Sequence, residues 1–425
     1  MACGVRSWTS RSALPSPGAE SSGSLAEPFP AGRSTPGRHA RRVAPQGSAR
    51  LGAVGRKGPH DAVVRSPCPQ APKTRIVHMS TRESTDSCGA RHESVAVRQI
   101  EPLPYTLLTR DAAGSGLSAD SLPGLGYVRL RRGVWGPAGV EQADPDVRIA
   151  AVAAQLPTRS ALGGWSAARL HEKAAAEDGL EVFDGGPEWE DASGPGPITA
   201  GRARVVVCSP RHSRPALRPD VRVFRSGVLP GDLERLAGID TTSACRTAFD
   251  LARLLPASRG VVGVDRLMHL GLVAATDLRS MLESRRAWRG ASVARRVAAL
   301  TDGASESPQE SLLRLLWLAT GLPRPRCNVV LRDRAGRFVA RVDLLDDVAG
   351  IVGEYDGAVH AEASRRSRDA QRQEALETLG LVVVRATSVD LVPGPRTRAW
   401  QRRLRDAYRR AASRPPGTRN WVASV

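Results

Sequence analysis

The chain has 425 residues, of which 41% are hydrophobic and 25% charged, and its formal net charge is +19. That length allows two or three domains with cores of their own. No apolar run approaches the length of a membrane span, so a transmembrane helix is not expected. The six cysteines show no CxxC and no zinc-type Cys/His spacing, which argues against a zinc site or a disulfide framework and favours a cytoplasmic protein.

The positive charge is unevenly distributed and consists almost entirely of arginine. Residues 1–78 hold 12 Lys and Arg against 3 Asp and Glu, and the chain's three lysines are Lys57, Lys73 and Lys173. Such an excess of arginine is typical of a GC-rich genome. The charge therefore permits a surface that binds nucleic acid but does not establish one.

Residues 1–95 are rich in Ser, Pro, Gly and Arg and lack sustained hydrophobic periodicity. Such a segment cannot bury enough apolar surface to offset its chain entropy, which predicts disorder. It contains no apolar core of a secretory signal. Met79 opens "MSTREST", and the preceding stretch reads like translated upstream DNA. We therefore expect a misassigned start, with residues 1–78 dispensable.

Residues 100–140 have the element order of a winged helix. Tyr127 to Trp135 alternates as a strand, with Arg129 and Arg131 on one side. Before it, the residues that indicate one short helix and the cap of a second are Leu107, Leu108, Ala112, Ala113 and Ser118. In a winged helix the recognition helix enters the major groove and the wing touches the backbone, so the two arginines are candidate DNA contacts. The alternative is a surface hairpin, because "PG" at 123–124 leaves little room for a recognition helix.

Residues 146–300 are predicted to form a mixed domain. The segments "DVRIAAVAAQL", "SALGGWSAARLHE" and "TSACRTAFDLARLL" have helical periodicity, and "ARVVVCS" and "VRVFRS" are typical of strands. Further helices are expected over "RGVVGVDRLMHLGLV" and "ATDLRSMLES". His171 and His269 lie at helix ends beside apolar residues, where we expect partly buried, hydrogen-bonded side chains. No nucleophile–base pair and no phosphate-binding glycine loop is recognisable here.

Residues 305–412 carry the clearest pattern. Ser307 at the N-cap, Pro308 and Glu310 predict a helix that stops at Gly321. The predicted elements that follow are the strand "RFVARVDLL", a turn at "DDVAG", the strand "IVGEYDG", the helix "ASRRSRDAQRQEALETLG", the apolar strand "LVVVRAT" and the basic helix "RTRAWQRRLRDAYRRAA". We expect "LVVVRAT" at the sheet centre. The residues of the first strand expected on one face are Phe338, Ala340, Val342 and Leu344, with Arg341 and Asp343 on the other.

Acidic residues interrupt these strands. A hairpin closed at "DDVAG" brings Asp343 and Glu354 side by side. Two neighbouring carboxylates repel each other and raise each other's pKa unless a cation lies between them. Hard oxygen ligands suit Mg²⁺, or Mn²⁺ in its place, and such an ion can polarise a phosphodiester and supply a bound hydroxide. The pair therefore predicts a metal site for phosphate chemistry.

The stretch "RFVARVDLL…GIVGEYDGAVH…RRSRDAQRQEALETLGLVVVRAT" resembles the PD-(D/E)XK nuclease superfamily. The similar branch is that of small domains related to the very-short-patch-repair endonuclease, and the resemblance covers residues 305–412. The whole frame, with a winged-helix-like module and a mixed middle segment, resembles actinobacterial proteins grouped with abortive-infection type IV antitoxins. This implies an α/β (α+β), multi-domain chain that ends in a restriction-endonuclease-like domain with a mixed sheet.

The resemblance also implies roles for single residues. Asp343 would be the central metal ligand, Glu354 the second acid, and Glu310 would complete the acidic cluster. His360 matches the histidine that the repair-type branch uses near the scissile phosphate. The arginines of the next helix that would contact phosphate are Arg366 and Arg372.

One position departs from the superfamily pattern. Asp356 stands where the motif has lysine, and no lysine follows Lys173. No ammonium can therefore orient the attacking water. His360, whose pKa lies near neutrality, is the candidate substitute as general acid and base. Without such a substitute the site is inactive.

Structural explanations exist for most of these residues. Glu310 forms a capping box with Ser307 in any case, and Asp343 can pair with Arg341 or Arg385. The Asp356–Gly357 dipeptide is also a turn signature. His360 can cap the next helix, and the arginines of 365–372 can form a solvated face. Glu354 is hardest to explain structurally, because an unpaired carboxylate inside an apolar strand is costly.

The sequence thus favours a cytoplasmic, Mg²⁺- or Mn²⁺-dependent DNA endonuclease with an N-terminal DNA-binding-like module. The alternative is a non-catalytic, antitoxin-like transcriptional regulator whose degenerate nuclease fold only binds DNA. A third possibility is an interaction protein without a nucleic-acid role. The absent lysine favours the regulator, and the Asp343, Glu354 and His360 set favours the enzyme. DNA is the expected partner, with no membrane and no small-molecule cofactor, and the oligomeric state stays open.

Overall fold

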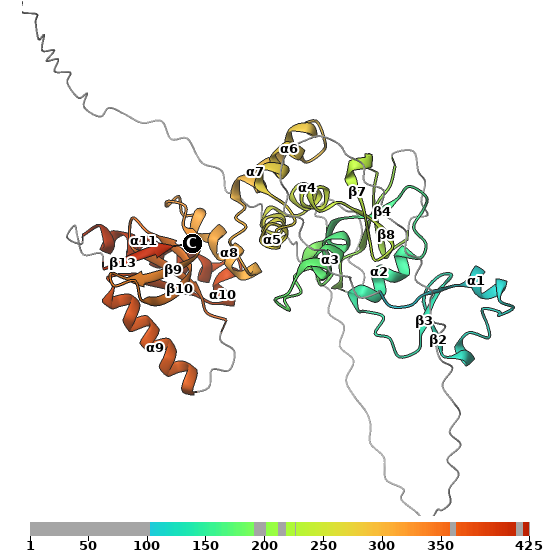
Figure 1. Cartoon of the computed structure of the whole chain (residues 1–425), viewed down its shortest axis with the longest axis horizontal. Helices are drawn as coiled ribbons and strands as arrows, with labels where there is room; N and C mark the ends of the chain where they lie inside the picture. Colours follow the sequence, from blue (N-terminus) through green and yellow to red (C-terminus); the bar gives the residue numbers. More distant parts are fainter. Residues whose placement is uncertain are drawn as a thin grey trace, which may run out of the picture. The chain divides into compact units, whose positions relative to one another are not determined.

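The computed structural model describes residues 103–190, 201–210, 218–225, 227–357, 363–413 and 420–424, with only the backbone of 363–370 and of 424. These residues belong to the second of two compact units, residues 89–425. The expected disorder and misassigned start fall on residues outside this range. The fold is α+β and multi-domain, with helices and three sheets (Figure 1). None of the described helices is long and apolar enough to cross a bilayer.

The first sheet belongs to the winged-helix-like module, and its strand order is β1-β3-β2. Its elements are β1 (Leu107–Leu108), α1 (Thr109–Gly114), the 3-10 turn η1 (Pro123–Leu125), β2 (Tyr127–Arg131) and β3 (Val134–Pro137). Leu107 and Leu108 are therefore a strand and not part of a helix. The predicted basic hairpin is present. Only η1 stands between α1 and β2, so residues 103–140 contain no recognition helix.

The second sheet, of order β6-β5-β4-β8-β7, lies in the middle domain. Its strands are β4 (Ala161–Leu162), β5 (Val205–Cys208), β6 (Val221–Phe224), β7 (Leu233–Leu236) and β8 (Ile239–Thr242). The helices are α2 (Pro145–Ala153), α3 (Gly164–Ala175), α4 (Ala244–Leu254), α5 (Ala257–His269), α6 (Ala275–Ser284) and α7 (Ala291–Leu300), with η2 (Pro187–Trp189) and η4 (Pro230–Asp232) between them. His171 is buried and its Nε2 lies 2.8 Å from the carbonyl oxygen of Thr242, as expected of a satisfied histidine.

The third sheet, of order β12-β11-β10-β9-β13, forms the C-terminal domain. Its elements are α8 (Pro308–Leu318), β9 (Arg326–Asp333), β10 (Phe338–Asp346), β11 (Ile351–Tyr355), α9 (Ala363–Thr378), β12 (Val382–Ala386), α10 (Ser388–Leu391), α11 (Pro395–Ala412) and β13 (Trp421–Ser424). The helix–hairpin–helix–strand–helix order is present, with β9 and β13 as additional strands. Since β11 and β12 pair in parallel and the other pairs are antiparallel, the sheet is mixed.

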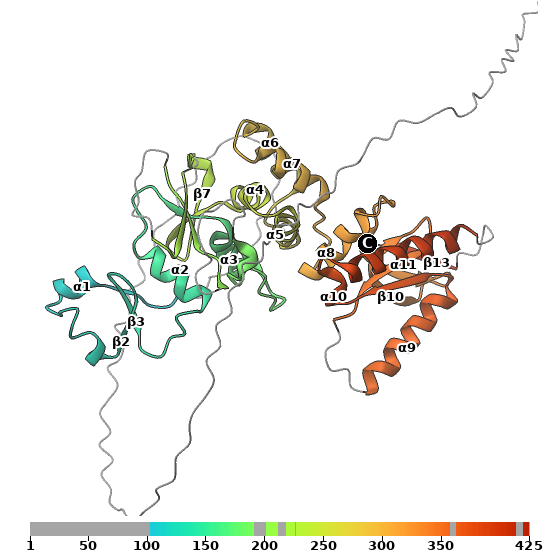
Figure 2. The ribbon, with the colours of Figure 1, turned by 180° about the vertical axis from the view of Figure 1, so that it is seen from behind.

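Helices cover both faces of this sheet (Figure 2). Leu376 and Leu379 of α9 pack with Val352 on one face, whereas Trp317 of α8 and Trp400 of α11 pack with residues of the other. The apolar strand β12 lies at the edge of the sheet and not at its centre, which is β10. Its continuous apolar pattern arises because helices cover it on both faces, and such cover does not require a central position.

The side chains of β10 do not alternate as predicted. Ala340 and Val342 belong to the core beside α9, whereas Leu344 belongs to the core beside α8 and α11, and Phe338 is exposed. The change of side takes place at Asp343. A one-residue break in the period-2 pattern is typical of a local irregularity in a sheet, which often re-aims a side chain at a functional site.

Candidate functional site

The candidate site lies where β10 and β11 separate. The hairpin pairs Leu344 with Gly353, and no backbone pairing of the two strands is found beyond that point in the described sheet. At the next position the carboxylate of Asp343 accepts a hydrogen bond from the backbone N–H of Tyr355, at 2.7 Å from Oδ2. A side chain thus takes the place of a backbone partner, and this holds Asp343 at the opening between the strands.

A row of polar residues crosses the sheet at this level. The pairing of Val342 with Val329 and of Leu344 with Cys327 sets Asp343 opposite Asn328. On its other side, the register of β10 and β11 places Asp343 opposite Glu354, and Glu354 in turn pairs with Arg385. The row therefore runs Asn328, Asp343, Glu354, Arg385 through four neighbouring strands. Its central pair is the one predicted from the sequence.

Glu310 reaches the same place from the first turn of α8. Ser307 caps this helix, accepting from the Glu310 N–H at 3.2 Å and donating to Glu310 Oε1 at 2.9 Å. The second oxygen, Oε2, accepts from the Glu306 N–H at 2.9 Å and from Asn328 Nδ2 at 2.5 Å. Both explanations of Glu310 therefore hold: it caps the helix, and Asn328 ties it to the polar row.

Asn328 is a member of the site that the sequence reading missed. Its φ of +51° lies in the left-handed region, which is uncommon for a residue other than glycine. Nδ2 also donates to the carbonyl oxygen of Ala304 at 2.7 Å, so one amide bridges the chain before α8 and the acid on it. An asparagine within the apolar alternation of "RCNVVLRD" was the available signal. It was overlooked because this segment was not assigned as a strand.

The three acids influence one another electrostatically. Burial raises the pKa of Asp343 to about 6, and the nearby carboxylates of Glu310 and Glu354 raise it further. The Tyr355 N–H and the Arg372 guanidinium act in the opposite direction. A carboxyl group whose pKa is raised by burial together with like charges is a recognised mark of functional sites.

Glu354 is 5% exposed and is matched by arginines. Arg372 Nη2 lies 2.7 Å from Glu354 Oε1, and Arg385 Nε lies 3.8 Å from Oε2. Arg372 also donates to the carbonyl oxygen of Arg341 at 2.5 Å, which anchors α9 to β10. The costly buried carboxylate is therefore paired, and it belongs to a site of mixed charge.

A cavity of about 500 Å³ adjoins Arg385 at the β12 edge. The residues that line it are Gln373, Val383, Val384, Arg385, Arg403, Asp406 and Arg410. Three of its seven lining residues are arginines, against one acid, so its surface attracts anions. Arg385 links this cavity to Glu354, which places an anion-attracting surface next to the acids.

The oxygen donors fit a hard divalent cation. Asp343 has one oxygen bound to Tyr355, and Glu354 faces it across the strand opening, so the pair matches the one or two carboxylates that Mg²⁺ usually takes from a protein. Among the described residues, no group of three or more His, Cys, Asp or Glu has the arrangement of a metal centre. Glu310, with its oxygens bound to α8 and Asn328, is accordingly not a third ligand.

The other predicted site residues have different positions. His360 and the Arg366 side chain lie outside the described residues, whereas Arg372 is at the site. Arg129 is exposed on the β2–β3 ribbon. The Arg131 side chain is only 8% exposed and lies 3.4 Å from Asp220 of the middle domain. Arg131 is therefore not available to DNA phosphate as predicted, because the ribbon presents this face to the protein.

Comparisons with known proteins identify relatives but no activity. No family model matches the chain, and no solved structure matches it significantly. Two uncharacterised proteins of Mycobacterium tuberculosis, MT2308 of strain CDC 1551 and Rv2248 of strain H37Rv, are each 28% identical over 169 residues. The alignment spans 40% of this chain and 62% of each relative. The chain is thus similar to less than two thirds of each mycobacterial protein.

Proposed function

We propose that residues 305–412 form a metal-dependent endodeoxyribonuclease domain of the PD-(D/E)XK type in a cytoplasmic protein. The observation that carries this proposal is the meeting of Asp343, Glu354 and Glu310 where β10 and β11 separate. Like charges are costly to gather unless a ligand relieves them. The arginines beside them supply the positive surface that a polyanionic substrate requires.

Each group has a separate role in this proposal. Asp343 and Glu354 would hold Mg²⁺ or Mn²⁺, which when bound can activate water and polarise the phosphodiester. Glu310 and Asn328 would fix the opening of the strands through their mutual hydrogen bond. Arg372 would neutralise Glu354 in the free protein and meet phosphate in the complex. His360 is proposed to handle protons in place of the absent lysine.

The second candidate is a DNA-binding regulator of antitoxin type with an inactive nuclease fold. Two observations favour it: Asp356 stands at the lysine position, and Arg372 and Arg385 already neutralise Glu354. Arginines that balance the buried acid would keep the fold stable without a metal. In this case the basic surface alone would act, by binding phosphates without hydrolysing them.

A cleavage assay on the full chain separates the two candidates. Supercoiled and linear DNA would be incubated with the wild type in Mg²⁺ or Mn²⁺, beside Asp343→Ala and His360→Ala. The nuclease requires that Asp343→Ala abolishes cleavage. His360→Ala should slow it by about 10²–10⁴-fold, the usual contribution of general acid–base catalysis, with little change in DNA affinity.

The control is Asp333→Asn, which removes an exposed carboxylate of the same sheet that is paired with Arg337 at 2.7 Å. It should cleave like the wild type. Absence of cleavage in any divalent metal, together with weaker DNA binding and a shallower salt slope in Arg366→Gln and Arg372→Gln, would establish the regulator instead. Cleavage that survives Asp343→Ala would place the catalytic site elsewhere.

A further inference from the structure

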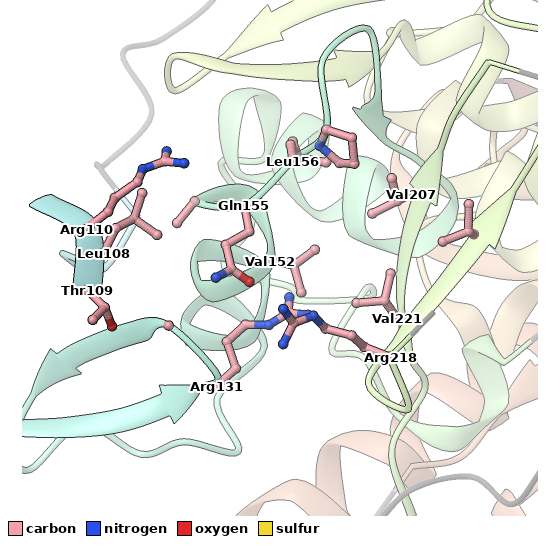
Figure 3. A pocket seen from close by; sticks show the side chains of 14 residues that line it. Leu108, Thr109, Arg110, Arg131, Val152, Gln155, Leu156, Val207, Arg218 and Val221 are labelled. Carbon is pink, nitrogen blue, oxygen red and sulfur yellow. The ribbon is translucent and has the colours of Figure 1, made fainter. Parts of the chain in front are cut away.

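A cavity of about 440 Å³ lies beside the basic ribbon, far along the chain from the acidic site. Its lining comes from the β1–α1 junction, the ends of β2 and α2, and strands β5 and β6 (Figure 3). A volume in the range of 300–1,000 Å³ is typical of pockets for metabolite-sized ligands. Size alone names no ligand, so the identity of the occupant rests on the groups that line the cavity.

Two buried polar atoms that line this cavity have no hydrogen-bond partner among the described residues: Arg131 Nε, a donor, and Gln155 Oε1, an acceptor. The Gln155 side chain is held in place by its other end, since Nε2 donates to the Arg132 carbonyl at 3.0 Å. Buried polar atoms are nearly always paired, and an unpaired one is costly. A ligand that accepts from Arg131 and donates to Gln155 would remove both costs.

Positive charge predominates in the cavity. The Arg131 and Arg218 side chains lie beside each other, with Gln155 and Val152 next to them (Figure 3). Burial lowers the pKa of Arg131; Asp220 opposes this effect and Arg218 reinforces it. Asp220, at 3.4 Å, is the carboxylate paired with Arg131, and its own side chain is 46% exposed. A single half-exposed carboxylate leaves the two guanidiniums an excess of positive charge, which an anion would balance.

The rest of the wall is apolar. The residues that form it are Leu108, Val152, Leu156, Val207, Val221 and Val223. These side chains cannot hydrogen-bond, so they favour a ligand that carries a hydrocarbon or aromatic body. A bare inorganic ion would leave this surface in contact with water only.

We propose that this cavity binds a small organic anion whose carboxylate or phosphate lies against Arg131 and Arg218 and whose body packs on the valines of α2, β5 and β6. A planar anionic group suits arginine because the guanidinium presents parallel N–H donors. A hydroxyl or amino group on the ligand would donate to Gln155. The site is independent of the proposed nuclease chemistry, and ligand binding would join the ribbon to the middle sheet.

Isothermal titration of the full chain tests the proposal with probes that separate the two halves of the ligand. Phenyl phosphate and benzoate carry both an anion and an apolar body, inorganic phosphate carries the anion alone, and benzyl alcohol the body alone. We expect saturable binding, at one site per chain, of at least one of the first pair. It should be tighter by about tenfold or more than binding of either half, since a charged hydrogen bond and a buried ring each contribute at this level.

Variants locate the binding. Arg218→Gln should weaken the bound probe about tenfold, as expected for one charge-assisted contact, and Gln155→Leu should weaken hydroxylated probes such as salicylate more than benzoate. Arg132→Gln, which removes an exposed arginine from the β2–β3 turn, is the matched control and should leave binding unchanged. Arg131→Gln is a further variant, to be read only with its unfolding curve because Arg131 also pairs with Asp220.

Three outcomes would overturn the proposal. In the first, neither phenyl phosphate nor benzoate binds at millimolar concentration. In the second, inorganic phosphate binds as tightly as phenyl phosphate, which would mean a plain anion site. In the third, Arg132→Gln weakens binding as much as Arg218→Gln, which would indicate attraction by the overall charge of the chain. All three can be distinguished from a failure of the nuclease proposal, because no readout here depends on DNA cleavage.

Discussion

The middle and C-terminal domains both bury charged side chains, but in opposite ways. In the middle domain every buried acid around η4 and α4 faces arginines. Asp232 accepts from Arg246 at 2.7 Å and from Arg285, and Asp250 accepts from Arg246 at 3.0 Å and from Arg253 at 2.7 Å. Charge thus alternates through the network, and each group removed from water is matched by an opposite charge.

In the C-terminal domain, acids meet acids. Asp343 lies near Glu310 and Glu354, and the arginines that offset them come from one side only, on α9 and β12. A matched network holds elements together, whereas gathered like charges raise the energy of the free protein until a ligand relieves them. The difference teaches that burial of charge does not mark a functional site in this chain; imbalance of buried charge does.

The largest expected effect comes from breaking the matched network. Arg246 is fully buried, bridges two carboxylates and lies 4.8 Å over the Trp288 ring. Arg246→Met should lower the free energy of unfolding by about 3–5 kcal/mol, because it leaves two buried acids short of a partner. Urea unfolding measures this. The control Arg235→Met, in an exposed pair with Asp240, should change stability by about 1 kcal/mol or less; equal effects would remove the basis of the comparison.

A smaller effect, of opposite sign, is expected at Asp343. Its pKa of about 6 lies above the ordinary 3.8, so between these pH values the folded protein keeps a proton that the unfolded chain has lost. Stability therefore falls as pH rises through this window, by up to about 3 kcal/mol. Asp343→Asn should remove this fall and be more stable than the wild type at pH 7. A variant that is less stable at pH 7 would make Asp343 a structural residue.

The smallest effect concerns the competition between metal and arginine for Glu354. Mn²⁺ should raise the melting temperature of the wild type, since a ligand at 100 times its Kd stabilises by about 2.7 kcal/mol, and Asp343→Asn should abolish the shift. Arg372→Gln should enlarge it by about 1 kcal/mol or less, because the ion pair with Glu354 is partly exposed. Arg409→Gln, on the exposed side of α11, is the control. A shift that persists in Asp343→Asn would move the metal elsewhere.

Local pattern predicted most of the elements. The capped helix at Ser307, the strands with Asp343 and Glu354 and the parallel strand 382–386 follow from caps and β-branched runs, which act over a few residues. Strand β9 was missed because an asparagine and flanking arginines interrupt its apolar pattern. The recognition helix was wrong for a similar reason: the proline and glycine near 123 left room for η1 only.

The sequence by itself determined that an acidic hairpin, Asp343 with Glu354, would lie in a mixed sheet, since the turn between two strands fixes which residues face each other. Only the tertiary structure decided the surroundings of that pair. The change of side at Asp343, the bond from Asn328 to Glu310 and the approach of Arg372 join segments distant along the chain. It also decided that Arg131 turns inward. Packing of elements against one another sets these contacts, and no local pattern of residues encodes it.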